Sequence, residues 1–312
     1  MKLNRRQFLT SSIAVAGGVL LGGRTLAAPL AHAARPAQVA PPNPFELVPL
    51  GKTGVKVCRI GLGTGMRGGN RQSDHTRMGK EAFEALIKAA WDRGVRLFDM
   101  ADIYGTHPFV AGALKGLPRD QYALVTKMWT GKGGLPEPER PDADVVVERF
   151  RKELATDYID VVQIHCQTAA DWTDKQKKQM DILETLKAKK IIRAHGASFH
   201  SLAALEAAAA SPWVDVVHVR INAYGDKMDA APEKVAPVVE KIHAAGKGVI
   251  GMKLIGEGLF SASDEKRDKS VQYVLGLGTV DAMVVGFLKI PEIGDFGDRV
   301  AKALQAKAAA TA

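Results

Sequence analysis

Short apolar runs alternate with longer stretches of helical periodicity from Glu46 onward, and this alternation limits the possible folds more than any other feature of the sequence. Strands that alternate regularly with helices form parallel β-α-β units. Eight such units in about 260 residues match the usual size of a closed barrel. The sequence therefore predicts an α/β fold, a (β/α)8 TIM barrel over residues 46–306. The predicted strands are 59–64, 96–101, 122–129, 160–166, 192–199, 214–222, 247–255 and 282–288.

An N-terminal β-hairpin is predicted ahead of the first barrel strand, because a turn with two glycines separates the apolar segments 47–50 and 55–57. An open doubly wound sheet is the main alternative to the barrel. Such a sheet usually carries Gly-x-Gly-x-x-Gly directly between a strand and a helix. Here Gly61, Gly63 and Gly65 come closest, but roughly fifteen residues follow before a helix begins. The barrel is therefore favoured.

Residues 1–33 have the features of an export signal. The pair Arg5-Arg6 precedes an uncharged stretch from Ser11 to Gly23, and Ala31-His32-Ala33 has the small-residue pattern of a cleavage site. The stretch is too short and too weakly apolar for a stable membrane anchor. The segment resembles a twin-arginine signal. This implies contact with the twin-arginine translocation machinery and export of the folded protein to the periplasm or another extracytoplasmic location.

The composition excludes several classes of protein. The net charge is +9, but no basic run carries interleaved aromatic residues, so nucleic acid is not an expected partner. The two cysteines, Cys58 and Cys166, are too few for a disulfide framework or a four-cysteine metal site, and both are expected to be small buried hydrophobes. Outside the barrel, the proline-rich residues 34–45 predict a linker, and residues 307–312 predict a short alanine-rich tail.

Four titratable side chains fall near the carboxyl ends of consecutive predicted strands. Asp99 and Tyr104 lie at and just beyond the end of the second strand, Lys127 near the end of the third, and His165 near the end of the fourth. In TIM barrels the side chains that do chemistry come from these ends, so we expect the four to converge on one mouth. A metal site at His165 and Cys166 is not expected, because consecutive strand residues point to opposite faces.

The segments that carry these residues resemble the aldo-keto reductase family. An Asp followed five positions later by a Tyr in residues 97–105, the Val-Thr-Lys of 125–127, the segment 154–165 and Gly196-Ala197-Ser198 are each similar to a family segment, in the family's order. The resemblance runs from about Leu47 to Leu304. It implies an oxidoreductase that reduces aldehyde or ketone groups by hydride transfer from a nicotinamide cofactor, NADP or NAD.

The resemblance also gives each of the four residues a role. Tyr104 is the expected proton donor to the alkoxide that hydride addition creates. Because a free phenol has a pKa of about 10, Lys127 is expected to lower the pKa of Tyr104. Asp99 is expected to keep Lys127 charged and oriented. His165 is expected to donate a hydrogen bond to the carbonyl oxygen.

The candidate cofactor-binding residues are Ser198, Lys253, Gly286 and Lys289, and they follow the family pattern less closely. Phe199 stands where the family usually has Asn, the sixth strand lacks the usual Gln, and the segment after the seventh strand lacks the usual aromatic-Ser pair. Acidic residues follow Lys289, and an acidic group near a 2′-phosphate favours NAD by repulsion. The sequence leaves the choice between NADP and NAD open.

Two further functions stay open at this point. Lys127 could instead be the Schiff-base amine of a lyase or isomerase barrel, or the chain could be a non-catalytic module that binds cofactor for sensing or assembly. His195 and His218 fall in mid-strand and are expected to be core histidines. Trp129 and Trp172 begin the loops after the third and fourth strands, where they either line the substrate pocket or pack against the barrel.

Overall fold

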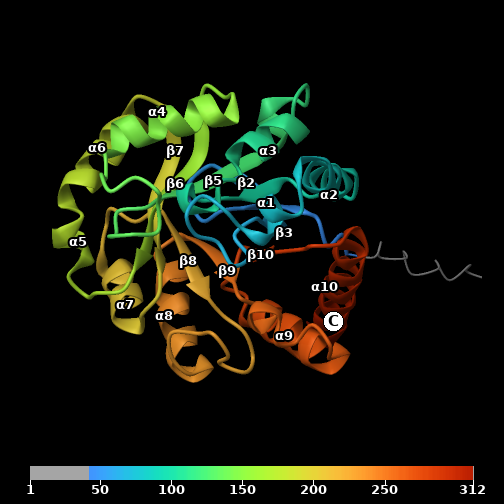
Figure 1. Ribbon diagram of the computed structural model, residues 1–312. Helices are drawn as coiled ribbons and strands as arrows, with labels where there is room; N and C mark the ends of the chain where they lie inside the picture. Colours follow the sequence, from blue (N-terminus) through green and yellow to red (C-terminus); the bar gives the residue numbers. More distant parts are fainter. Residues whose placement is uncertain (1–41, 312) are drawn as a thin grey trace, which may run out of the picture. The chain divides into compact units, whose positions relative to one another are not determined.

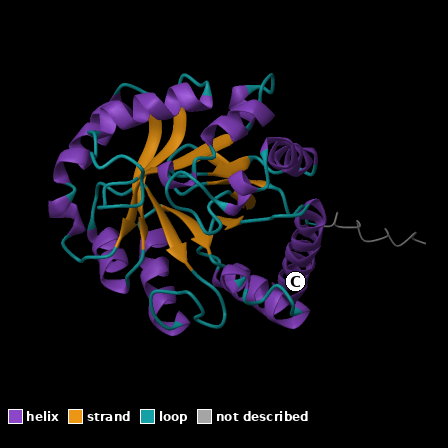
Figure 2. Ribbon diagram, in the orientation of Figure 1, coloured by secondary structure: helices purple, strands orange, loops and turns teal. Residues whose placement is uncertain are grey.

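Eight parallel strands close into a barrel in the computed structural model, which describes residues 42–311. Barrel strands adjacent in the chain are adjacent in the sheet, and the last strand pairs with the first, with Met283 opposite Ile60. Figure 2 shows the strands inside and the helices around them. The predicted TIM barrel is confirmed. The barrel strands are β3 (Ile60–Gly63), β4 (Leu97–Asp99), β5 (Ala123–Met128), β6 (Ile159–Gln167), β7 (Ile192–Phe199), β8 (Val216–Arg220), β9 (Gly248–Met252) and β10 (Ala282–Val285).

Helices follow the strands and cover the outside of the barrel (Figure 1). In α2 the apolar residues Phe83, Leu86, Ile87 and Ala90 are all buried, which is the stripe expected of an amphipathic helix. The α-helices are α1 (Asp74–Arg77), α2 (Lys80–Asp92), α3 (His107–Ala113), α4 (Ala143–Leu154), α5 (Trp172–Lys175), α6 (Lys177–Ala188), α7 (Leu202–Ala210), α8 (Pro232–Ala244), α9 (Asp264–Leu277) and α10 (Ile290–Thr311). Short 3-10 turns are η1 (Asp102–Tyr104), η2 (Arg119–Gln121) and η3 (Gly256–Gly258).

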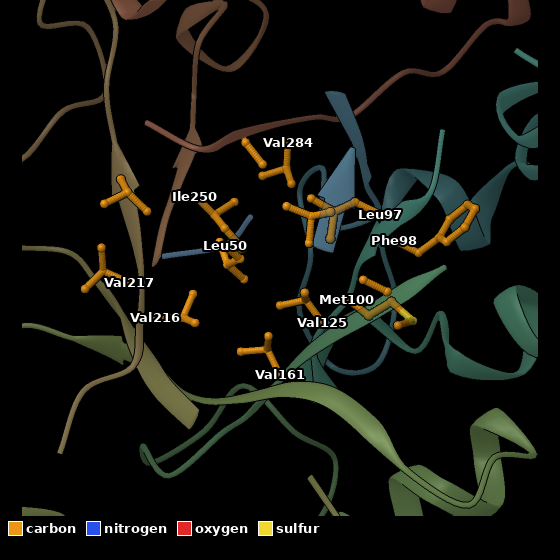
Figure 3. Packing of buried hydrophobic residues seen from close by; sticks show 14 of the residues in the cluster. Leu50, Leu97, Phe98, Met100, Val125, Val161, Val216, Val217, Ile250 and Val284 are labelled. Atoms are coloured by element: carbon orange, nitrogen blue, oxygen red, sulfur yellow. The ribbon is translucent and has the colours of Figure 1, made fainter. Parts of the chain in front are cut away.

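The N-terminal hairpin closes the amino-terminal end of the barrel. Its strands β1 (Leu47–Pro49) and β2 (Lys56–Cys58) pair antiparallel, as predicted. The Lys52 N–H in its turn donates to the carbonyl of Gly246, just before β9. Leu50 is fully buried, and Figure 3 shows it inside the barrel among aliphatic side chains of the barrel strands. These are Leu97, Val125, Val161, Val216, Ile250 and Val284.

Several sequence-based expectations concern the two ends of the chain. The twin-arginine segment at 1–33 lies outside the described residues, as does most of the 34–45 linker. Residues 307–311, which the sequence separates as a tail, are the last residues of α10. Within residues 42–311, no helix has both the length and the apolar character needed to cross a bilayer.

Candidate active site

Asp99 and Lys127 form an ion pair inside the carboxyl end of the barrel. β4 ends at Asp99, and Lys127 is the last residue but one of β5. The Lys127 ammonium donates to Oδ1 of Asp99 and, at 3.0 Å, to the carbonyl of Met100. Burial opposes ionisation of Asp99, but Lys127 and His218 outweigh it and lower the pKa of Asp99 to about 2. Asp99 therefore carries its charge at neutral pH.

Tyr104 and His165 meet beside this pair. Tyr104 is the last residue of η1, which Gly105 ends with a left-handed φ of 67°. The Tyr104 hydroxyl lies 3.4 Å from Nε2 of His165, and the two rings meet edge to face with centroids 5.6 Å apart. The Lys127 Nζ lies 5.8 Å from the centroid of the Tyr104 ring. The structure thus gathers the four predicted side chains at one mouth of the barrel.

The surroundings of Tyr104 keep its phenol protonated. Burial, together with the Asp99 carboxylate and Cys166, raises the pKa of Tyr104 above its ordinary value. This differs from the expectation that Lys127 lowers that pKa, because the ammonium is held by other acceptors and burial prevails. Burial and the Lys127 charge also lower the pKa of His165 well below its ordinary value. A protonated phenol beside a neutral imidazole suits proton donation at neutral pH.

The two tryptophans that follow barrel strands have different surroundings. Trp129 is half-buried, and its ring meets the His165 ring edge to face with centroids 5.4 Å apart. Trp129 therefore forms part of the wall of the site. Trp172 is 1% exposed and packs against Phe199 and Trp213, so it belongs to the packing outside the barrel.

A groove beside Tyr104 holds two of the four candidate cofactor residues. Its lining comes from the segments at the carboxyl ends of β9, β10, β3 and β4, and it includes Lys253 and Gly286 along with Asp99. The Lys253 ammonium lies 2.8 Å from a carboxylate oxygen of Glu257. Its charge is therefore largely balanced by the protein itself.

The other two candidates do not line this groove. Ser198 is 1% exposed, and its hydroxyl oxygen accepts the N–H of Cys166 at 2.8 Å. Lys289 is exposed and lies beyond the end of β10. All four candidates thus lie toward the carboxyl end of the barrel, but only Lys253 and Gly286 line the groove.

The lining of the groove fits a flat nicotinamide ring. A Cβ added at Gly63 would meet no atom closer than 3.6 Å, and one at Gly286 none closer than 3.5 Å. The packing of the protein therefore does not require glycine at either position. The missing side chains leave room beside Tyr104 for a ring to lie against the backbone.

His218 is the site residue that sequence reasoning missed. It is fully buried, and its Nε2 lies 3.1 Å from Oδ1 of Asp99. The sequence places it in mid-strand, which suggests only a core histidine. The signal that could have found it is the two-residue alternation of β8, because His218 shares a face with Val216, whose side chain lies inside the barrel in Figure 3. His195, in contrast, stacks on Trp213 and contacts Glu184 outside the barrel.

Cys166 lies where β6 departs from regular pairing. The register with β7 shifts between Ile164 and Gln167, and Cys166 has a φ of 61°. It is half-buried, whereas Cys58 is fully buried as expected. Simple alternation therefore does not describe the position next to His165. Across residues 42–311, no group of three or more His, Cys, Asp or Glu side chains is arranged to hold a metal ion.

Comparison with known proteins gives matches over most of the barrel. A model of the Aldo/keto reductase family matches residues 59–275. An aldo-keto reductase of Bacillus subtilis is 35% identical over 128 residues, which cover 39% of this chain and 38% of that protein. An NADH-specific methylglyoxal reductase of Escherichia coli is 30% identical over 174 residues, which cover 49% of this chain and 52% of that protein. The chain thus spans about half, or less, of the length of these curated relatives.

Solved structures extend the likeness to nearly the whole described chain. An aldo-keto reductase from Bacillus halodurans matches with a TM-score of 0.65 and 18% identity, covering 84% of this chain and 96% of that chain. At this level of identity the likeness shows that the fold is shared.

Proposed function

Since the chain belongs to the aldo/keto reductase family, we propose that it reduces aldehyde or ketone groups by hydride transfer from a nicotinamide cofactor, with Tyr104 as the proton donor. The observation that carries this proposal is the Tyr104 hydroxyl, which lies 3.4 Å from Nε2 of His165 and beside the Asp99–Lys127 pair. A dinucleotide bound in the groove would supply the hydride. The groups of the chain hold the carbonyl and provide the proton.

Each side chain has a defined part in this reaction. A carbonyl oxygen placed between Tyr104 and His165 lies within reach of a hydroxyl and of an imidazole N–H, so it is oriented before charge develops. As charge develops on that oxygen, the phenol transfers its proton to it. Lys127 stabilises the phenolate that results, and Asp99 fixes the position of Lys127. The Trp129 ring packs edge to face against the His165 ring and so helps to hold the imidazole in position.

Replacement of the proton donor tests this function. Tyr104→Phe removes the hydroxyl and keeps the ring, so turnover of a panel of aldehydes, ketones and quinones is expected to fall by about 100-fold or more. Binding of the dinucleotide, followed by quenching of tryptophan fluorescence, is expected to change little. Full reductase activity in the variant would exclude Tyr104 as the donor. Absence of turnover in the unmodified protein with both NADH and NADPH would contradict the proposed function.

The two other functions are less well supported. A Schiff base needs a free amine, whereas the Lys127 amine is engaged by the Asp99 carboxylate and the Met100 carbonyl. A non-catalytic module would not need a proton donor beside the groove. The same turnover assay distinguishes both from a reductase.

The far end of the groove supports a preference for NADH over NADPH. The groove continues past Met66 and Gly258 to Glu292 and Asp295. One oxygen of Glu292 accepts the backbone N–H groups of Leu288 and Lys289, at 2.8 and 3.2 Å. The amides that could bind a phosphate are thus already satisfied by a carboxylate of the chain.

The cations at this end are also engaged. Arg267 contacts Asp295 at 2.7 Å, and Arg299 contacts the same carboxylate at 2.8 Å. Carboxylates accept hydrogen bonds from ribose hydroxyls and repel a 2′-phosphate. The ratio of kcat/KM for NADH to that for NADPH is therefore expected to exceed about ten, and Glu292→Gln is expected to reduce it. A ratio below one would contradict the preference.

We also propose that the protein is exported in the folded state. The support is the order of sequence elements in residues 1–33, with an arginine pair, an uncharged stretch and a small-residue cleavage pattern. Fractionation of cells is expected to find the shortened protein outside the cytoplasm, and a variant with Arg5→Lys and Arg6→Lys retained inside. Equal distribution of the two proteins would contradict export by this route.

A further inference from the structure

A second histidine lies behind the four side chains of the site. His218, in β8, is fully buried, and its Nε2 lies 3.1 Å from Oδ1 of Asp99. Lys127 contacts the same carboxylate oxygen from β5. Apart from this approach, neither ring nitrogen of His218 has a hydrogen-bond partner among residues 42–311. The imidazole is therefore held in the barrel with Asp99 as its polar neighbour.

The contact is not explained by packing alone. A buried nitrogen without a partner costs about 1–3 kcal/mol, so an apolar residue would be the less costly choice at a position needed only to fill the barrel. Val216 is such a residue two positions earlier on the same face of β8. A polar ring at this depth is consistent with a role that uses its N–H.

We propose that His218 is a positioning residue, which holds the Asp99 carboxylate and so limits how strongly that carboxylate opposes the Lys127 charge at Tyr104. This inference rests on the proposed reductase function. His218 is not one of the four catalytic residues that the sequence predicts.

The direction in which His218 changes the acidity of Tyr104 follows from Oδ1 of Asp99, which both His218 and Lys127 contact. Burial and the Lys127 charge lower the pKa of His218, so the ring is neutral and has a single N–H to donate. With that N–H on Nε2, the positive edge of the ring faces Oδ1 of Asp99 at 3.1 Å, and part of the negative charge of the carboxylate is compensated by His218 instead of by Lys127. More of the Lys127 charge is then felt at Tyr104. Loss of the imidazole N–H therefore makes the Tyr104 phenol a weaker acid.

Other titratable groups also surround His218 and stay in place when it is changed. They are Asp99 from β4, Lys127 from β5, His165 and Cys166 from β6, His200 after β7, Lys253 and Glu257 after β9, and the ion-paired Arg71 and Asp102 on the η1 side. Of these groups only Lys127 also contacts Oδ1 of Asp99, and it approaches as a cation from β5, so none of them replaces the contact that His218 makes.

The test is the pH dependence of alcohol oxidation, in which Tyr104 must first lose its proton. In His218→Leu, kcat at any pH on the rising limb of the profile is expected to fall by about threefold or more, equivalent to an upward shift of about half a pH unit. KM for the alcohol and the dissociation constant of the dinucleotide are expected to stay the same. His218→Gln keeps an N–H donor at a similar reach. Its kcat on the rising limb of the pH profile is expected to be much closer to that of the unmodified protein.

A matched control comes from another buried histidine of a barrel strand. His195→Leu removes an imidazole that is fully buried in β7 but contacts Glu184 and Trp213 outside the barrel. It is expected to lower the thermal unfolding temperature and leave the profile unchanged. If His218→Leu does not fold, His218→Met fills the volume without a donor and is measured instead.

Three results would overturn the inference. One is an unchanged profile in the folded leucine or methionine variant. Another is an equal shift of the pH profile in His195→Leu, which would indicate a general loss of packing. The third is weaker dinucleotide binding with an unmoved profile, which would make His218 a cofactor contact. An unmodified protein without any turnover would instead contradict the proposed function itself.

Discussion

Tyr104 lies beneath a loop whose small residues determine how closely the chain can approach the phenol. A Cβ added at Gly65 would come within 2.2 Å of Cζ of Tyr104, and one at Gly68 within 2.5 Å of Cδ1. Neither glycine has a positive φ, so the requirement is for space and not for a special backbone conformation. The loop buries the ring, and burial is the main cause of the raised pKa of Tyr104.

Substitution in this loop tests whether the position of the phenol matters to the reaction. Gly65→Ala forces the Tyr104 ring or the loop to move, so kcat for carbonyl reduction is expected to fall by about tenfold or more. Gly69→Ala is the matched control, because a Cβ there would meet nothing within 4 Å. Its kcat is expected to match that of the unmodified protein. Equal rates in the two variants would show that the loop does not position Tyr104.

The sequence predicts the identity of the four side chains better than their electrostatics. Asp99, Lys127 and His165 could be assigned because parallel strands bring their carboxyl ends to one mouth. The pKa of Tyr104 could not, because it depends on a loop that packs over the ring from a distant part of the chain. His218 was missed because the alternation of β8 indicates only that its side chain faces the inside of the barrel, and not that it contacts the charged Asp99.

Among the elements, the hairpin is the one whose role goes beyond what its sequence indicates. The turn glycines predict the hairpin itself, and the structure shows that it covers the amino-terminal end of the barrel through Leu50. The strands were predicted in number and order. Most strands are shorter than the predicted ranges, because pairing stops where the chain turns toward a helix. For example, β8 covers Val216–Arg220, whereas the predicted strand is 214–222.

Truncation of Leu50 measures how much this closure contributes to stability. Leu50→Ala removes a fully buried side chain from the end of the barrel and is expected to lower the free energy of unfolding by about 2–5 kcal/mol. Leu47→Ala is the control in the same hairpin, since Leu47 is 50% exposed, and its effect is expected to stay within about 0.5 kcal/mol. Chemical denaturation followed by circular dichroism gives both values. A small loss for Leu50→Ala would mean that the barrel closes without it.

For the molecule as a whole, a partly buried polar network ties α4 to the segment that carries Tyr104. Arg149 in α4 contacts Asp102 of η1 at 2.7 Å and Glu153 at 2.8 Å. Glu153 in turn contacts His107 at 2.6 Å. Burial opposes ionisation of Glu153, but His107 and Arg149 outweigh it and lower the pKa of Glu153 from 4.5 to about 2.

The acid stability of the protein depends in part on this carboxylate. A carboxyl with a lowered pKa in the folded state stabilises the protein above its unfolded pKa, and this stabilisation is lost as the pH falls through the folded pKa. Glu153→Gln is therefore expected to melt at a lower temperature than the unmodified protein at pH 7. The difference is expected to shrink between pH 4.5 and about 2. Glu148→Gln, on the same helix but half-exposed, controls for the change in net charge. A difference that stays constant across this range would contradict the assignment.

The closed amino-terminal end has a consequence for the order of events in a catalytic cycle. Leu50 and the aliphatic side chains around it fill the barrel on the amino-terminal side of the site, so in the proposed reaction both bulk water and the product would reach Tyr104 from the carboxyl end. In the reaction proposed above, departure of the alcohol is therefore expected to precede recovery of the proton by Tyr104, and both steps would use the same opening. An increase in solvent viscosity and the replacement of water by deuterated water are accordingly expected to slow the same phase of turnover, the one that follows hydride transfer.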